Sequence, residues 1–198
     1  MSHSADTGPC WEIDVSRLIH LNGPPGIGKS TLARRYVDAH PGVLNCDIDV
    51  LRTLIGGWKS DFAAAGALIR PAALAMIEAY LGNGRDVVLP QMLLDPSELA
   101  RFEAAATNVN SQFVERFVMD TTPAAVVDRF HRRGATETDD PWHAEVRAIV
   151  AAAGGDEVLT RSHAALQRLL SERPNAVVIM STEGAEAEAY RSLVDSLN

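Results

Sequence analysis

Residues 19–36, IHLNGPPGIGKSTLARRY, form the segment that most constrains what this chain can fold into. Within it, Gly23, Gly28, Lys29 and Ser30 fit the pattern G-x-x-x-x-G-K-[ST]. A short apolar run precedes the pattern, as in a buried parallel strand, and apolar residues at helical spacing follow it. The segment therefore predicts a strand, a glycine-rich loop and a helix, in that order, around a site for a nucleoside triphosphate.

The composition of this loop suits phosphate binding. Backbone N–H groups must converge on phosphate oxygens, and glycines leave that approach open, while the two prolines stiffen the loop. The helix that begins near Lys29 directs its positive end at the phosphates. We expect Lys29 to reach the β- and γ-phosphates of ATP and the Ser30 hydroxyl to bind Mg²⁺. The predicted nucleotide site comprises Gly23, Pro24, Pro25, Gly26, Ile27, Gly28, Lys29, Ser30 and Thr31. The alternative is a glycine- and proline-rich turn that matches by chance, without the flanking strand and helix.

Strand-like and helix-like runs alternate along the rest of the chain. This alternation indicates βαβ units, and so an α/β fold of three layers, α/β/α, with a mostly parallel five-stranded central sheet. Residues 1–16 are expected to form a tail and residues 17–198 a single domain. Expected strands cover 17–22, 42–49, 85–91, 111–120 and 175–180, and expected helices cover 30–40, 50–57, 66–81, 95–107, 122–133, 144–153, 157–172 and 184–197, with Pro71 at the start or at a kink of the third helix.

Charge and composition exclude several classes of protein. The 198 residues carry a formal net charge of −8, which argues against a surface that holds long nucleic acid. The sequence lacks a run of about 18 apolar residues, and its first residues do not resemble a signal peptide. Cys10, Cys46 and the six scattered histidines form no metal-binding spacing. We therefore expect a cytoplasmic protein with no membrane partner.

Two carboxylates follow the second expected strand, in the segment CDIDVLR. Asp47 and Asp49 are two residues apart, so on an extended strand end both side chains point the same way. One carboxylate then organises Mg²⁺, and the other accepts a proton from an attacking hydroxyl. The alternative is helix capping, with Asp49 as the N-cap and Asp47 in solvent. The position after a phosphate loop favours catalysis.

A basic helix and a polar segment follow the fourth expected strand, in residues 128–143, DRFHRRGATETDDPWH. Arg129 and Arg133 are four residues apart and share a helix face, where planar guanidinium groups suit phosphate oxygens. The polar segment after them suits a lid that excludes water. The alternative is a solvated helix face whose arginines pair with nearby acids. Ligands of parallel sheets lie at the carboxyl ends of strands, which adds Gln91 to the same rim.

The order of these motifs resembles the small P-loop kinases that phosphorylate metabolites or antibiotics, a group with shikimate and gluconate kinases, chloramphenicol phosphotransferase and the tunicamycin-resistance protein. The segments DVVLPQMLLDPSELARF (86–102) and VVDRFHRRGA (126–135) are most similar to the tunicamycin-resistance type. The resemblance implies a P-loop NTPase fold with a helical lid at about 129–155. It also implies Asp49 as the base, Asp47 near Mg²⁺, and Ser181 and Thr182 beside adenine. The LPQM segment departs from many relatives.

The sequence thus predicts an ATP-dependent kinase that moves the γ-phosphate to a hydroxyl of a small molecule, an antibiotic or a metabolite. The predicted catalytic residues are Lys29, Asp49, Arg129 and Arg133; those for the substrate are Asp49, Arg52 and Gln91; those for Mg²⁺ are Ser30 and Asp47. Arg52 contacts an anionic acceptor or only forms a salt bridge, and Trp58, Phe62 and Met92 line an acceptor pocket or belong to the core. The alternative functions are a polynucleotide or nucleotide 5′-hydroxyl kinase and a nucleotide-regulated ATPase or binding protein.

Overall fold

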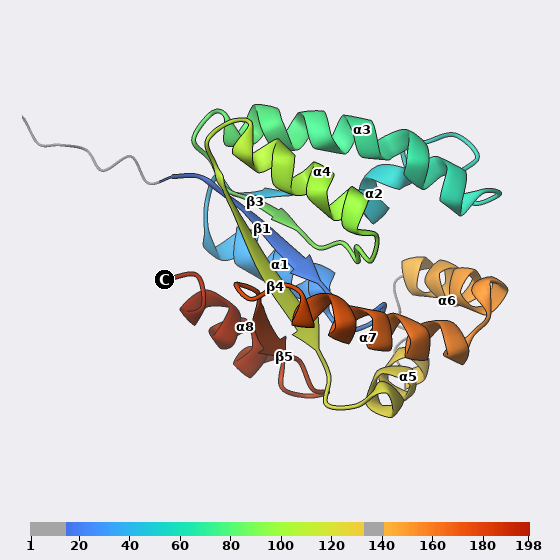
Figure 1. Ribbon diagram of the computed structural model, residues 1–198. Coiled ribbons are helices and arrows are strands. Elements are labelled where there is room, and N and C mark those ends of the chain that lie inside the picture. Colours follow the sequence, from blue (N-terminus) through green and yellow to red (C-terminus); the bar gives the residue numbers. More distant parts are fainter. Residues whose placement is uncertain (1–14, 133–140) are drawn as a thin grey trace, which may run out of the picture.

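A computed structural model describes residues 15–132 and 141–198 (Figure 1). Five parallel strands form its central sheet, in the order β2-β3-β1-β4-β5. The strands are β1 (Arg17–Asn22), β2 (Leu44–Asn45), β3 (Val87–Leu89), β4 (Gln112–Met119) and β5 (Val177–Met180). The predicted α/β fold with a five-stranded parallel sheet is confirmed.

Helices cover both faces of this sheet. They are α1 (Lys29–Ala39), α2 (Ile48–Arg52), α3 (Phe62–Leu81), α4 (Pro96–Thr107), α5 (Pro123–Arg132), α6 (Pro141–Ala153), α7 (Asp156–Ser171) and α8 (Glu186–Asp195). Helices α3 and α4 lie over one face and α1 and α8 over the other, while α5 and α6 lie beyond the carboxyl ends of the strands (Figure 1). Helix α7 runs back from them and packs Leu166 and Leu169 into the cluster with α3 and α4. The phosphate loop therefore lies between the sheet and the helices at this end.

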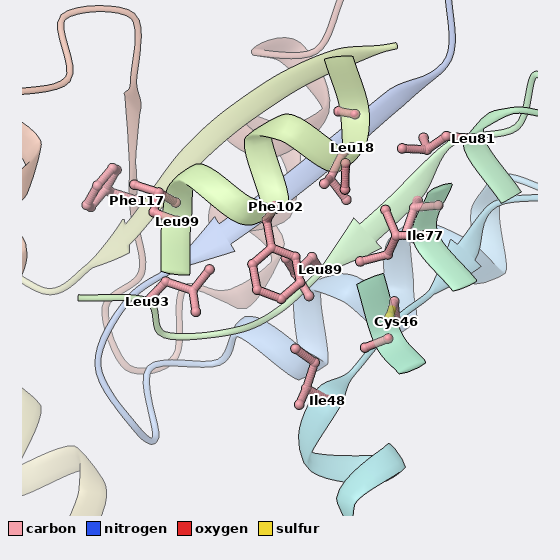
Figure 2. Close-up of a cluster of buried hydrophobic side chains, with 14 of the residues drawn as sticks. Leu18, Cys46, Ile48, Ile77, Leu81, Leu89, Leu93, Leu99, Phe102 and Phe117 are labelled. Atoms are coloured by element: carbon pink, nitrogen blue, oxygen red, sulfur yellow. The ribbon is translucent and has the colours of Figure 1, made fainter. Parts of the chain in front are cut away.

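Alternation along the strands divides the apolar core in two. Leu18 of β1 faces the cluster with α3 and α4, whereas its neighbour Ile19 faces the cluster with α1 and α8. Figure 2 shows the first cluster, in which Phe102 of α4 is fully buried. Cys46 lies in the same cluster, and burial raises the pKa of its thiol to about 12. This cysteine is thus a small neutral core residue at physiological pH.

The elements between α1 and β3 differ most from the sequence-based expectations. The second strand spans Leu44–Asn45 rather than 42–49, because Asp47 caps a helix that begins at Ile48. The next helix, α3, begins at Phe62 rather than near 66, with Asp61 as its N-cap. Pro71 lies inside α3 and not at its start.

A proline inside α3 is tolerated because of where it lies on the helix. Pro71 and Ala67, four residues earlier, are both exposed, so the carbonyl that lacks its usual N–H donor is on the solvent side. By length and composition alone, α3 is long and apolar enough to span a membrane, and 28% of its most apolar stretch is buried. The core helix of a soluble protein can be equally long and apolar, so this is weak evidence for a membrane.

Candidate active site

The phosphate loop joins β1 to α1 and depends on close backbone approaches. A Cβ atom on Gly23 would lie 2.3 Å from the carbonyl oxygen of Val118, closer than real contacts allow. Gly26 and Gly28 have φ of 78° and 104°, in the left-handed region that favours glycine. Gly28 is also the N-cap of α1 and gives its first amides no side-chain acceptor. These amides therefore offer hydrogen bonds to an anion at the loop.

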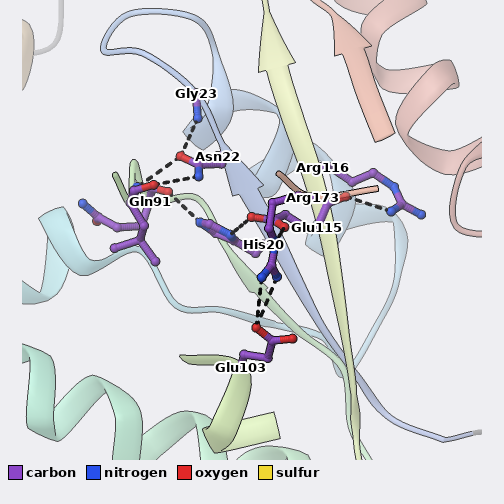
Figure 3. Close-up of polar contacts among 9 residues, drawn as sticks. His20, Asn22, Gly23, Gln91, Glu103, Glu115, Arg116 and Arg173 are labelled. Atoms are coloured by element: carbon purple, nitrogen blue, oxygen red, sulfur yellow. Dashed lines mark hydrogen bonds and ion pairs between the residues drawn. The ribbon is translucent and has the colours of Figure 1, made fainter. Parts of the chain in front are cut away.

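Hydrogen bonds from Asn22 fix the start of the loop (Figure 3). The Gly23 amide donates to Asn22 Oδ1 over 3.0 Å, and the Leu93 amide donates to the same oxygen over 3.1 Å. Asn22 Nδ2 donates to Leu93 O over 2.9 Å, and His20 Nε2 lies 2.8 Å from Gln91 O. The buried side chains of β1 thus hold the segment after β3 beside the phosphate loop. Neither His20 nor Asn22 is among the residues predicted for the site from the sequence.

The same network continues to Glu115, which lies 3.8 Å from His20 Nδ1 (Figure 3). Glu115 Oε2 accepts a 2.7 Å hydrogen bond from Arg173, whose guanidinium also contacts Glu103 at 3.2 Å. Burial raises the pKa of the Glu115 carboxyl, but the interactions with His20 and Arg173 outweigh it, and the net pKa is lowered. The ionised carboxylate is therefore favoured beneath the strand that leads into the loop.

Lys29 lies over the loop that precedes it. Its Nζ donates to the carbonyl oxygens of Gly23 and Pro24 over 2.8 and 2.9 Å. Lys29 and Ser30 line a cavity of about 510 Å³ together with Asp47, Asp49 and other residues. The structure thus brings the predicted ATP-binding loop and both predicted carboxylates to one cavity.

The two carboxylates occupy the first turn of α2, not a strand end as predicted. Asp47 is the N-cap: it is 7% exposed, and its Oδ1 accepts a 3.1 Å hydrogen bond from the Asp49 amide. The predicted alternative, capping by Asp49, is therefore wrong about which residue caps. The Asp49 side chain is 36% exposed, and its Oδ1 lies 3.4 Å from Arg52 Nη1.

The pKa of the Asp49 carboxyl is raised. Burial in the cavity is the main cause, since it penalises the charged form; Arg52, Lys29 and Arg70 oppose the rise in pKa, and Asp47 adds to it. A carboxyl with a raised pKa, beside a phosphate loop and open to a cavity, has the properties of a general base.

The other predicted substrate residues share this cavity. Arg52 and Gln91 are 4% and 8% exposed and both line it. Phe62 and Met92 are part of its wall, whereas Trp58 is not among the described residues that line it.

Arg129 lies on the other side of Gly28, away from the larger cavity. It donates to the carbonyl and, at 3.3 Å, to the hydroxyl of Ser181, and its Nη1 lies 3.8 Å from Asp120 Oδ2. Arg129 and Ser181 line a smaller cavity of about 300 Å³. The Ser181 hydroxyl also donates to Ile27 O over 2.9 Å, so Arg129 and Ser181 together brace the loop. Arg133 lies outside the described residues.

The fold and the loop define a P-loop nucleotide-binding protein. A model of the AAA domain family matches residues 18–154, and the chain belongs to this family. No curated protein matches the chain significantly.

Solved structures share the fold at low sequence identity. A gluconokinase from Sinorhizobium meliloti 1021 is 18% identical, with a TM-score of 0.53 and coverage of 92% of this chain and 96% of that one. A candidate kinase from Chloroflexus aurantiacus J-10-fl is 14% identical, with a TM-score of 0.64 and the same coverage. A chain of the Pnkp1/Rnl/Hen1 RNA repair complex is 19% identical, with a TM-score of 0.60, over 81% of this chain and 47% of that one. These likenesses show a kinase-like P-loop fold.

Proposed function

We propose that this protein is a kinase that transfers the γ-phosphate of ATP to a hydroxyl of a small molecule. One observation carries the proposal: a carboxyl with a raised pKa, that of Asp49, lines the same cavity as Lys29 and Ser30 of the phosphate loop. A protein that only binds nucleotide has no need of a base at this place, whereas an ATPase uses a base to activate water, so dependence on an acceptor separates a kinase from an ATPase. The kinase-like neighbours support the reaction class, and the acceptor rests on the cavity alone.

The loop and α1 hold the triphosphate through backbone amides. Lys29 exchanges the carbonyls of Gly23 and Pro24 for the β- and γ-phosphates, a movement that its flexible side chain permits. Ser30 and Asp47 offer oxygen atoms to the cavity, and oxygen is the ligand that Mg²⁺ prefers, so these residues fit a Mg²⁺ site. Bound Mg²⁺ neutralises charge on the phosphates.

Asp49 then receives the proton of the acceptor hydroxyl. The hydroxyl oxygen forms a bond to the γ-phosphorus, the bond from that phosphorus to the β–γ bridging oxygen breaks, and ADP leaves with the electron pair. Arg129 keeps the loop and the turn after β5 in place beside the nucleotide. Of the expected lid, 129–155, residues 133–140 lie outside the described residues. The described part serves as the lid in this proposal, and Val150 in α6 supports that role because it lines the cavity.

The proposal is tested by measuring ADP formation with Mg·ATP and a panel of sugars, hydroxy acids, nucleosides, antibiotics and short oligonucleotides. We expect at least one small molecule to stimulate ADP formation and to gain a phosphoryl group by mass spectrometry, and Asp49→Asn to abolish the stimulation. Stimulation by oligonucleotides alone would replace this proposal with a polynucleotide 5′-hydroxyl kinase. ADP formation that never depends on an acceptor would show an ATPase instead.

A further inference from the structure

Basic side chains dominate the larger cavity. The described residues that line it include five cationic side chains, Lys29, Arg34, Arg52, Arg70 and Arg147, and only two carboxylates, Asp47 and Asp49. The whole chain has the opposite balance, with 18 lysines and arginines against 26 acidic residues. A net positive cavity in an acidic protein attracts an anionic ligand. Lys29 belongs to the phosphate loop, but the arginines come from α1, α2, α3 and α6 and exceed what the loop requires.

Arg52 is the most informative of these arginines. The residue is 4% exposed, yet its Nε and Nη1 atoms are buried without a hydrogen-bond partner among the described residues. The centre of its guanidinium lies 3.5 Å from the centroid of the Phe62 ring, which fixes the plane of the group. Gly66 lets it approach α3, because a Cβ there would lie 2.8 Å from Arg52 Nη2. A rigid, buried fork with unsatisfied donors requires an anionic partner.

Asp49 satisfies only part of this requirement. Its Oδ1 lies 3.4 Å from Arg52 Nη1, an ion pair in which Nη1 makes no hydrogen bond. A second cation is near, since Arg70 lowers the pKa of Arg52 and opposes the raised pKa of Asp49. Arg70 Nε is likewise buried without a hydrogen-bond partner, 3.5 Å from Glu98 Oε2. Two arginines therefore face the same cavity beside the candidate base.

Gln91 adds an acceptor for hydroxyl groups. Its backbone is held by His20, and its Oε1 is a buried atom at the cavity with no hydrogen-bond partner among the described residues. An amide oxygen in this position accepts a hydrogen bond from a ligand hydroxyl. The cavity thus combines donors for an anion, from arginines, with an acceptor for a neutral hydroxyl.

From this arrangement we infer that the phosphoryl acceptor is a small alcohol that carries an oxyanion group, a carboxylate or a phosphate, held by Arg52 and Arg70. The inference rests on the proposed kinase function and specifies its substrate class. Arg52 Nη1 and Asp49 Oδ1 are 3.4 Å apart. Because Arg52 binds the oxyanion and Asp49 receives the hydroxyl proton, these two groups lie only a few bonds apart in the acceptor. The cavity volume of about 510 Å³ suits a molecule of this size.

The test compares alcohols that differ only in the oxyanion. D-glycerate and glycerol 3-phosphate are paired with glycerol, and D-gluconate is paired with sorbitol. Calorimetry measures binding to the full chain, and ADP formation with Mg·ATP measures transfer. We expect an anionic member to bind and react at least tenfold better than its neutral partner. A preference among the anions then shows whether the oxyanion is a carboxylate or a phosphate.

Variants assign the anion to the two arginines. Arg52→Gln and Arg70→Gln should raise KM for the anionic acceptor by about 10–100-fold, the loss expected for hydrogen bonds to charged groups, and leave KM for ATP unchanged. Arg191→Gln, on the exposed side of α8, is the matched control. Arg70 is 29% exposed on α3, so its variant should fold even if the Arg52 variant does not.

The possible results test the anion site separately from the proposed kinase function. Neutral and anionic partners that react equally well, or an Arg70→Gln variant with unchanged KM for the anionic acceptor, would overturn the inference and leave the kinase standing. Anions that bind better than their neutral partners but receive no phosphoryl group would support the anion site and refute the proposed kinase function. No binding preference for any anion overturns the inference directly.

Discussion

Replacing Asp49 by asparagine tests the assignment of the base with almost no change in shape. The variant keeps the turn of α2, because the cap is made by Asp47 and the Asp49 contribution is a backbone amide. It loses the ability to accept a proton and the negative charge beside Arg52. Positioned bases contribute about 10²–10⁴-fold, so kcat should fall by that factor, about 3–5 kcal/mol in activation free energy. Binding of Mg·ATP should change little, because the loop amides are intact.

The raised pKa of Asp49 predicts two further effects with a defined sign. Since the base must be ionised, kcat/KM of the wild type should fall on the acid side, with an inflection above the ordinary aspartate pKa of about 3.9. A folded-state pKa above the unfolded value means that the charged form costs stability as the pH rises through that interval. At neutral pH, Asp49→Asn should therefore melt no lower than the wild type, and any advantage should vanish near pH 4.

Steady-state kinetics, thermal melting across pH and calorimetry with Mg·ATP check these statements on the same two proteins. Glu188→Gln is a matched control, because that carboxyl is exposed on α8, outside the cavity lining. An Asp49→Asn protein with unchanged kcat would refute the role of Asp49 as the base. A variant that loses activity only because it no longer binds ATP, or that melts well below the wild type at neutral pH, would refute the reasoning from burial.

Three other substitutions test the loop and its support. Gly23→Ala should destabilise the fold by about 1–3 kcal/mol in chemical unfolding, because the new Cβ meets Val118 O at 2.3 Å, whereas Gly56→Ala, with no neighbour within 4 Å, should be neutral; equal effects would contradict the contact. Glu115→Gln should cost about 1–3 kcal/mol at neutral pH, because Arg173 keeps Glu103, and this difference should shrink as the pH falls through the lowered pKa of Glu115; a difference that is constant with pH would contradict the ion network. Arg129→Gln should lower the melting temperature by removing its hydrogen bonds to the turn after β5, and an unchanged melting temperature would leave that contact without energetic weight.

The sequence predicted the features that depend on neighbours along the chain. The loop from Gly23 to Ser30 is such a feature, since glycine spacing and the flanking strand and helix are all local. The order of strands and helices followed from the same kind of pattern, and the parallel sheet followed from their alternation. Asp47 shows the limit of that reasoning: an Asp before an apolar residue fits a strand end and a helix cap equally well until packing decides between them.

The features that were missed depend on contacts between distant segments. Asn22 reaches Leu93 across 71 positions, and Arg129 reaches Ser181 across 52, distances in sequence that no periodicity reports. Nothing in the sequence indicates that Arg70 lies near Arg52, because the two arginines come together only when α2 and α3 pack. The two polar residues His20 and Asn22 in the apolar β1 were the one available signal for the network, since polar side chains in a buried strand must find partners.

The loop from Gly23 to Ser30 must bind a triphosphate if the proposed function is correct. Calorimetric titration of the full chain with Mg·ATP tests this claim directly, with Lys29→Ala as the matched variant. We predict saturable binding at one site in the wild type, weakened by about 10–100-fold in Lys29→Ala through the lost charged hydrogen bonds. A wild-type protein that shows no binding of Mg·ATP, or a Lys29→Ala protein that binds it equally well, would contradict the claim.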